Sequence, residues 1–186
     1  MAYLSDEELS IEIEKAASNA FSELFNNEET FYYCSLITKG EALPPFVVAW
    51  SYEALERYLK VNSCDEEDKE YIKWSYAESP YLDFGSNYFD DVKKIFYQRP
   101  PMDYNAPEIE WKKEFNIRLN SMESAMKRLD DKGLFGIGKE RNRLVINVEV
   151  MPPDYTNTLR AMRLNPIEAL SQWLIEAAEP IPTHLS

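Results

Sequence analysis

Two short segments rich in β-branched and aromatic residues constrain the fold of this chain most strongly. They are "TFYYCSLIT" (residues 30–38) and "PFVVAWS" (residues 45–51), and both have the composition of β-strands. The segment between them, "KGEALPP", contains glycine and proline, which favour a turn. The sequence therefore predicts two consecutive strands that can pair with each other.

Helical patterns surround these strands. Ser5 followed by Glu8 forms a capping box, and apolar residues then recur at helical spacing as far as Leu24. Further helices are predicted over 52–61 after Ser51, over 87–96, over 107–132 up to Gly133, and from an N-cap at Asn165 with Pro166 as the first helical residue. The expected inner face of the longest helix consists of Trp111, Phe115, Leu119, Met122, Met126 and Leu129.

A second pair of strands is predicted near the end of this order. "LFGIG" (134–138) and "RLVINVEV" (143–150) flank a polar "KERN" turn, which is typical of a β-hairpin. Two strand pairs among several helices favour an α+β domain: a mainly antiparallel sheet of about four strands with helices packed on it. At 186 residues we expect a single domain over 1–179, followed by a flexible C-terminal tail over 180–186.

The stretch "GLFGIGKE" (133–140) fits most of a P-loop, a phosphate-binding pattern. A working P-loop follows a strand and opens a helix, whereas here a helix leads in and a strand leads out. Glu140 also stands where Ser or Thr would hold magnesium. We therefore interpret Gly133 as a helix cap, and Gly136 and Gly138 as positions in a strand that bulges or lies close to another backbone.

Residue types that carry common chemistry are scarce. The single histidine is His184, near the C-terminus, and a histidine-based general base is not expected. Cys34 lies in a predicted strand and is interpreted as a buried thiol, while Cys34, Cys64 and one histidine cannot supply a four-ligand zinc site. We assign no catalytic, cofactor-binding or metal-binding residue, although an unrecognised carboxylate site remains an alternative among 33 acidic residues.

The charge is distributed unevenly along the chain. Residues 1–91 hold 20 acids and 6 bases, a net charge of −14, whereas residues 92–186 hold 13 acids and 14 bases, a net charge of +1. A negative field repels nucleic acid and anionic membranes and speeds encounter with a basic partner, although many proteins are acidic for solubility alone. With three acids and no base before the first apolar run, and without a long apolar stretch, we expect a cytoplasmic protein.

Bases do gather in the second half of the chain, where nearby acids balance them. We interpret them as a solvated face and expect no nucleic-acid partner. They are Lys127, Arg128, Lys132, Lys139, Arg141, Arg143, Arg160 and Arg163.

The segment "YIKWSYAESPYLDFGSNYF" (71–89) has the most unusual local composition, because it combines many aromatic residues with acidic ones. Tyrosine and tryptophan are enriched at the centres of protein interfaces. The alternative is that these rings cover the sheet. Just before it, four consecutive acids are interpreted as a helix start, since a calcium loop would need alternate acids and a glycine. The predicted protein-binding residues are Trp74, Tyr76, Tyr81, Asp83, Asp65, Glu66, Glu67 and Asp68.

Several stretches together resemble a bacterial family known as domain of unknown function 4303. They are "FYYCSLIT", "AWSYEALERY", "KWSYAESPY", "MESAMKRLDDKGLFGIGKERNRLVINVEV" and "LNPIEAL", which span nearly the whole chain. The resemblance brings no established catalytic residues. It implies a small bacterial cytoplasmic domain of a kind associated with toxin–immunity neighbourhoods.

These observations lead to one hypothesis and two alternatives. The hypothesis is a non-enzymatic, acidic protein-binding domain, such as an immunity protein that blocks a basic toxin, which exists as a monomer or weak homodimer. The alternatives are an enzyme with an unrecognised carboxylate site and a homo-oligomeric structural component.

Overall fold

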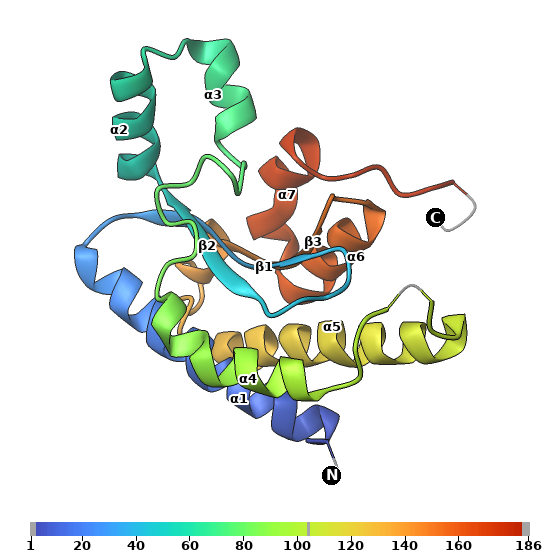
Figure 1. Ribbon diagram of the computed structural model, residues 1–186. Coiled ribbons are helices and arrows are strands. Elements are labelled where there is room, and N and C mark those ends of the chain that lie inside the picture. Colours follow the sequence, from blue (N-terminus) through green and yellow to red (C-terminus); the bar gives the residue numbers. More distant parts are fainter. Residues whose placement is uncertain (1–2, 104, 184–186) are drawn as a thin grey trace.

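A three-stranded sheet lies between two groups of helices in the computed structural model, which describes residues 3–103 and 105–183 (Figure 1). Helices α1, α4 and α5 cover one face of the sheet, and α2, α6 and α7 pack on the other. The elements, with η for a 3-10 helix, are α1 (Asp6–Leu24), η1 (Phe25–Asn27), β1 (Phe31–Lys39), β2 (Phe46–Ser51), α2 (Tyr52–Asn62), α3 (Glu66–Ile72), η2 (Ser86–Phe89), α4 (Asp90–Gln98), α5 (Glu108–Asp131), η3 (Arg141–Arg143), β3 (Val145–Met151), α6 (Tyr155–Leu164) and α7 (Ile167–Glu176).

The sheet has the strand order β2-β1-β3 and is mixed. β1 and β2 pair antiparallel, with Tyr33 opposite Trp50, which confirms the predicted pairing of consecutive strands. β3 pairs with β1 in parallel, with Tyr33 opposite Val145. The α+β class is therefore confirmed, but the expectation of about four mainly antiparallel strands was wrong.

The missing strand is "LFGIG", which forms turns between α5 and η3. Gly133, Gly136 and Gly138 have φ angles of 80°, 96° and 60°, a left-handed conformation that interrupts an extended strand. Gly133 does end the long helix as predicted, since the amide of Leu134 donates to the carbonyl of Leu129 (3.1 Å). Without a hairpin partner, β3 pairs with β1 through the long connection that parallel strands require.

Arg141 fixes this loop from within. Its guanidinium is buried, donates to the carbonyls of Leu144 (2.6 Å) and Leu164 (3.0 Å), and forms an ion pair with Asp130. Arg160 is buried as well. The interpretation of all these bases as a solvated face was therefore wrong for Arg141 and Arg160, because the loop and the sheet edge use them as hydrogen-bond donors.

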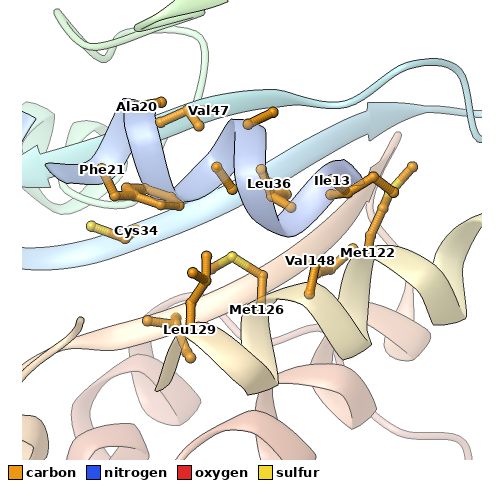
Figure 2. Packing of buried hydrophobic residues seen from close by; sticks show 14 of the residues in the cluster. Ile13, Ala20, Phe21, Cys34, Leu36, Val47, Met122, Met126, Leu129 and Val148 are labelled. Carbon is orange, nitrogen blue, oxygen red and sulfur yellow. The ribbon is translucent and has the colours of Figure 1, made fainter. Parts of the chain in front are cut away.

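The larger apolar core fills the space between the sheet, α1 and α5 (Figure 2). Ile13 and Phe21 of α1 face Met122, Met126 and Leu129 of α5 across the layer. Cys34, Leu36 and Val148 contribute from the sheet, so the interpretation of Cys34 as a buried free thiol is confirmed. Of the predicted inner face of α5, Trp111 and Phe115 at its N-terminal end are only half-buried.

A second core lies on the opposite face of the sheet. Tyr32, Tyr33 and Trp50 pack there against α2 and against Leu170 and Trp173 of α7. Because both faces are covered, β1 is buried over seven consecutive positions instead of alternating with solvent.

Side chains of α6 and the residue after it cover the outer edge of β3. Asn165 accepts from the amide of Ile146 (2.8 Å) and donates to its carbonyl (2.6 Å). Asn157 makes the same pair of bonds with Val150, at 2.9 and 3.1 Å. The predicted N-cap role of Asn165 was therefore wrong: Pro166 occupies the N-cap of α7, and the amide of Asn165 takes the place of a neighbouring strand.

The outer edge of β2 is covered too, by the chain that follows α3. Ser79 donates to the carbonyl of Ala49 (2.6 Å), and Phe84 forms an isolated antiparallel bridge with Val47. Both edges of the sheet are thus occupied by this chain's own groups. Of the predicted C-terminal tail, residues 180–183 follow α7 without helix or strand, whereas 184–186, including His184, lie outside the described residues.

Candidate functional site

Helices α2 and α3 project from the body of the molecule as an arm (Figure 1). The acidic run begins α3 as predicted, because Asp65 accepts from the amides of Glu67 (2.9 Å) and Asp68 (3.0 Å) as its N-cap. Glu66 forms an ion pair with Lys69 at 3.3 Å. All four predicted acids are exposed. Residues 52–72, which form the arm, hold seven acids and three bases, a net charge of −4.

Trp74 attaches the arm to the body. Its indole donates to Glu176 of α7 (2.8 Å), and the ammonium of Lys73 contacts the same carboxylate at 2.8 Å. Its ring packs edge-on against Tyr32, with 5.2 Å between the centroids. Partial burial opposes ionisation of Glu176, but the bonds from Lys73, Trp74 and Gln172 hold its pKa below the ordinary value. Trp74 is therefore half-buried at a structural contact.

Tyr81 is also held by neighbours. Its hydroxyl donates to Glu29 (2.6 Å) and accepts from Asn27 (3.0 Å). Arg57 contacts the other oxygen of Glu29 at 2.6 Å. Although partial burial raises the pKa of Glu29, hydrogen bonds from Ser51, Tyr81 and Arg57 leave it below the ordinary value. The Tyr81 ring thus fixes the aromatic segment beside the start of α2.

Tyr76 and Asp83 line one groove, with a volume of about 480 Å³, and we call it the Tyr76 groove. Its rim carries three apolar side chains that are unusually exposed: Leu43 at 39%, Leu82 at 45% and Tyr97 at 79%. Apolar side chains gathered in this way on a surface mark interaction sites. The full lining comprises Lys39, Leu43, Pro44, Pro45, Phe46, Tyr76, Leu82, Asp83, Lys93 and Tyr97.

The structure therefore separates the eight predicted residues into three places. Tyr76 and Asp83 meet in the groove, Trp74 and Tyr81 hold the aromatic segment in place, and the four acids begin α3. Sequence reasoning missed Leu43, Leu82 and Tyr97. A signal for Tyr97 was present, because it follows the buried Phe96 and lies off the apolar side of its helix.

A second hollow of about 580 Å³ adjoins the groove and shares Leu43, Pro44 and Tyr97 with it. Another hollow, of about 610 Å³, lies elsewhere, between α5 and α6. Its charged groups already have partners, since Arg163 forms an ion pair with Glu123 (2.7 Å) and Arg128 one with Glu14 (2.5 Å). That hollow therefore offers little to a ligand.

Glu149 is the carboxylate whose environment most resembles that of an acid–base group. Burial raises its pKa, and Tyr33 donates to it at 2.5 Å. Asn147 donates to the same oxygen at 3.1 Å. Glu149 lines none of the three hollows described above.

Three further findings bear on function. Among residues 3–103 and 105–183, no group of three or more histidine, cysteine or acidic side chains is arranged to hold a metal ion. In the same residues, no helix has the length and apolar character needed to cross a membrane. A family model described as a domain of unknown function (DUF4303) matches residues 13–166, whereas comparisons with curated proteins and with solved structures returned no match.

Proposed function

From the premise that this chain belongs to the DUF4303 family, a domain of unknown function, we propose that it is a non-enzymatic protein-binding domain. The Tyr76 groove takes apolar side chains of the partner, and the acidic arm attracts its basic residues. The observation that carries this proposal is the exposure of Leu43, Leu82 and Tyr97 around a groove that already contains Tyr76 and Asp83.

The occupied edges of the sheet argue against one common way of binding a partner protein. Partner proteins often add a strand to an open sheet edge, but Ser79 and Phe84 occupy the edge of β2, and Asn157 and Asn165 occupy that of β3. We therefore assign recognition to side chains in the groove and not to strand addition.

The choice of a basic partner rests on the arm. Lys39 and Lys93 line the groove with Asp83, so the groove itself is not acidic. The arm carries −4, within a chain of −13. Such a field raises association rates at low salt and is screened over about 8 Å at physiological ionic strength. A basic toxin held inactive by its immunity protein has the chemistry that this surface fits.

Site-specific photo-crosslinking in the cells that naturally contain the protein tests the proposal. A photoreactive residue at Leu82, on the groove, should yield one dominant protein adduct. The same residue at Ile175, which is 87% exposed on α7, is the matched control. We expect the adduct to have a high isoelectric point, and the Glu66→Gln/Glu67→Gln variant, which leaves the capping acids in place, to lower its yield.

Equal adducts at Leu82 and Ile175, or none at Leu82, would count against the groove. If the adduct is acidic and its yield is the same in the Glu66→Gln/Glu67→Gln variant, the proposal of a basic partner is contradicted. The assignment of the groove as the binding site would still hold. The homo-oligomer alternative predicts an adduct of this chain with itself, and light scattering of the purified protein would then show more than a monomer.

A further inference from the structure

Two buried arginines share a single buried carboxylate beneath the second hollow. Arg99 contacts Glu114 through Nε at 2.6 Å and Nη2 at 3.1 Å. Arg118 contacts the same carboxylate through Nε at 2.8 Å. Arg99, Arg118 and Glu114 are exposed by 7%, 3% and 6%, so the three side chains place a surplus positive charge inside the protein.

Both guanidinium groups also hold backbone carbonyls, which fixes them in place. Arg99 donates to Leu4 at 2.8 Å, and Arg118 donates to Ala42 at 3.2 Å and to Pro100 at 2.9 Å. A guanidinium carries five N–H donors, and each arginine uses three of them on the described residues. Every nitrogen of the two guanidinium groups thus has a partner, and within residues 3–103 and 105–183 two N–H groups of each arginine have no acceptor. Buried donors are normally satisfied.

The hollow above these arginines suits a ligand with an apolar body. Both arginines line it, together with Leu43, Phe96, Tyr97 and Met102. The guanidinium of Arg118 lies 5.1 Å from the centre of the Phe96 ring, so one side of the charge faces an aromatic surface. Planar guanidinium groups held in this way match the geometry of a carboxylate.

Glu41 limits the charge that the hollow can accept. It is half-buried and lines the same space. Its carboxylate opposes a second negative charge near the arginines, because like charges in a poorly solvated site repel each other strongly. A singly charged anion therefore fits better than phosphate, which carries more charge.

We propose that this hollow is a carboxylate-binding site for a ligand with one carboxylate and an apolar or aromatic body. The C-terminal residue of a peptide and a free carboxylic acid share that chemistry. The hollow shares Leu43, Pro44 and Tyr97 with the Tyr76 groove, but Arg99 and Arg118 line the hollow alone. Binding of small carboxylates can therefore fail while protein binding at the groove holds, and the reverse.

Titration followed by NMR tests the site, with the Nε–H signals of Arg99 and Arg118 as local probes. The ligands are 3-phenylpropionate, its neutral amide, a short peptide ending in phenylalanine with a free carboxylate, and the same peptide amidated. We expect both acids to shift the arginine signals and the amides to bind at least about tenfold more weakly, since they lose charge-assisted hydrogen bonds. Tighter binding of the peptide acid would identify a chain terminus as the ligand, and equal binding a small free acid.

Two variants make the test specific. Tyr97→Ala removes an exposed wall of the hollow and should weaken binding several-fold, whereas Tyr71→Ala, on the arm and of similar exposure, should leave it unchanged. Glu41→Gln should strengthen binding of the acids and allow inorganic phosphate to bind. The proposal is overturned if acids and amides bind alike, if neither binds, if Tyr97→Ala has no effect, or if the unmodified protein binds phosphate as well as the acids.

Discussion

Asn165 shows how one side chain can substitute for a strand. Its amide group supplies an acceptor and a donor to Ile146, and it also accepts from Arg141 at 3.0 Å. A side-chain amide has the same donor and acceptor atoms as a peptide group, so it satisfies an edge residue on both sides. The surrounding "LNP" pattern predicted an N-cap instead. That prediction failed because nothing local in the sequence indicates that a distant strand edge needs this amide.

Replacing Asn165 by leucine should be strongly destabilising. The change leaves the amide and carbonyl of Ile146 without their partners, and an unsatisfied buried group costs about 1–3 kcal/mol. We expect the free energy of unfolding to fall by about 2–4 kcal/mol in urea denaturation. Asn116→Leu, at an exposed position of α5, is the control and should change it by less than about 0.5 kcal/mol. Similar losses for both variants would contradict the role assigned to Asn165.

At the scale of elements, α3, the outer helix of the arm, is held to the body through few contacts. Glu176 accepts from both Lys73 and Trp74, and Tyr32 donates to the carbonyl of Lys73 at 2.6 Å. α3 itself contributes no buried side chain. An element with so little buried surface opens locally at a lower free energy than the core does.

The variant Glu176→Ala should therefore loosen the arm selectively. Loss of the shared acceptor should speed amide hydrogen exchange in α3 and residues 73–76 roughly fivefold, equivalent to about 1 kcal/mol. Exchange in β1 should be unchanged. Glu168→Ala on the same helix is the control, because the side chain of Glu168 is exposed. Uniform exchange after both substitutions would show that Glu176 does not hold the arm.

The elements were predictable where the signal is local. The capping box at Ser5, the N-cap at Ser51, the acidic start of α3 and Gly133 after α5 all act within a few residues, and the structure confirms each. The partner of β3 was not predictable, because its pairing with β1 depends on contacts more than 100 residues apart. The same limit applies to the groove, where Tyr76 and Asp83 meet the loop before β2, which lies about 30 residues earlier in the chain.

Two partly buried glutamates make the stability of the whole molecule depend on pH. Burial opposes ionisation of Glu14 and Glu29, but hydrogen bonds and nearby cations outweigh it and lower both pKa values below 4.5. The folded protein therefore binds these protons more weakly than the unfolded chain does. This contribution to stability is complete above the ordinary pKa and is lost as the pH falls below about 4.5.

Urea denaturation between pH 6 and pH 3.5 should show this loss. We expect the free energy of unfolding to fall on the order of 1 kcal/mol or more across that range. The Glu29→Gln variant should be less stable than the unmodified protein at pH 6 and should approach it at pH 3.5. A gap between the two that is constant with pH would mean that Glu29 is not ionised in its cluster with Arg57.

The central position of β1 also determines the order in which its two neighbours can pair with it during synthesis. β2 follows its partner within a few residues, so that hairpin can form as soon as it leaves the ribosome. The other side of β1 stays open until the ribosome has added every residue up to Met151. Throughout that interval, the edge of β1 that later pairs with β3 has unpaired backbone groups, although it is buried in the finished protein. A chaperone that binds nascent chains would find its binding site there.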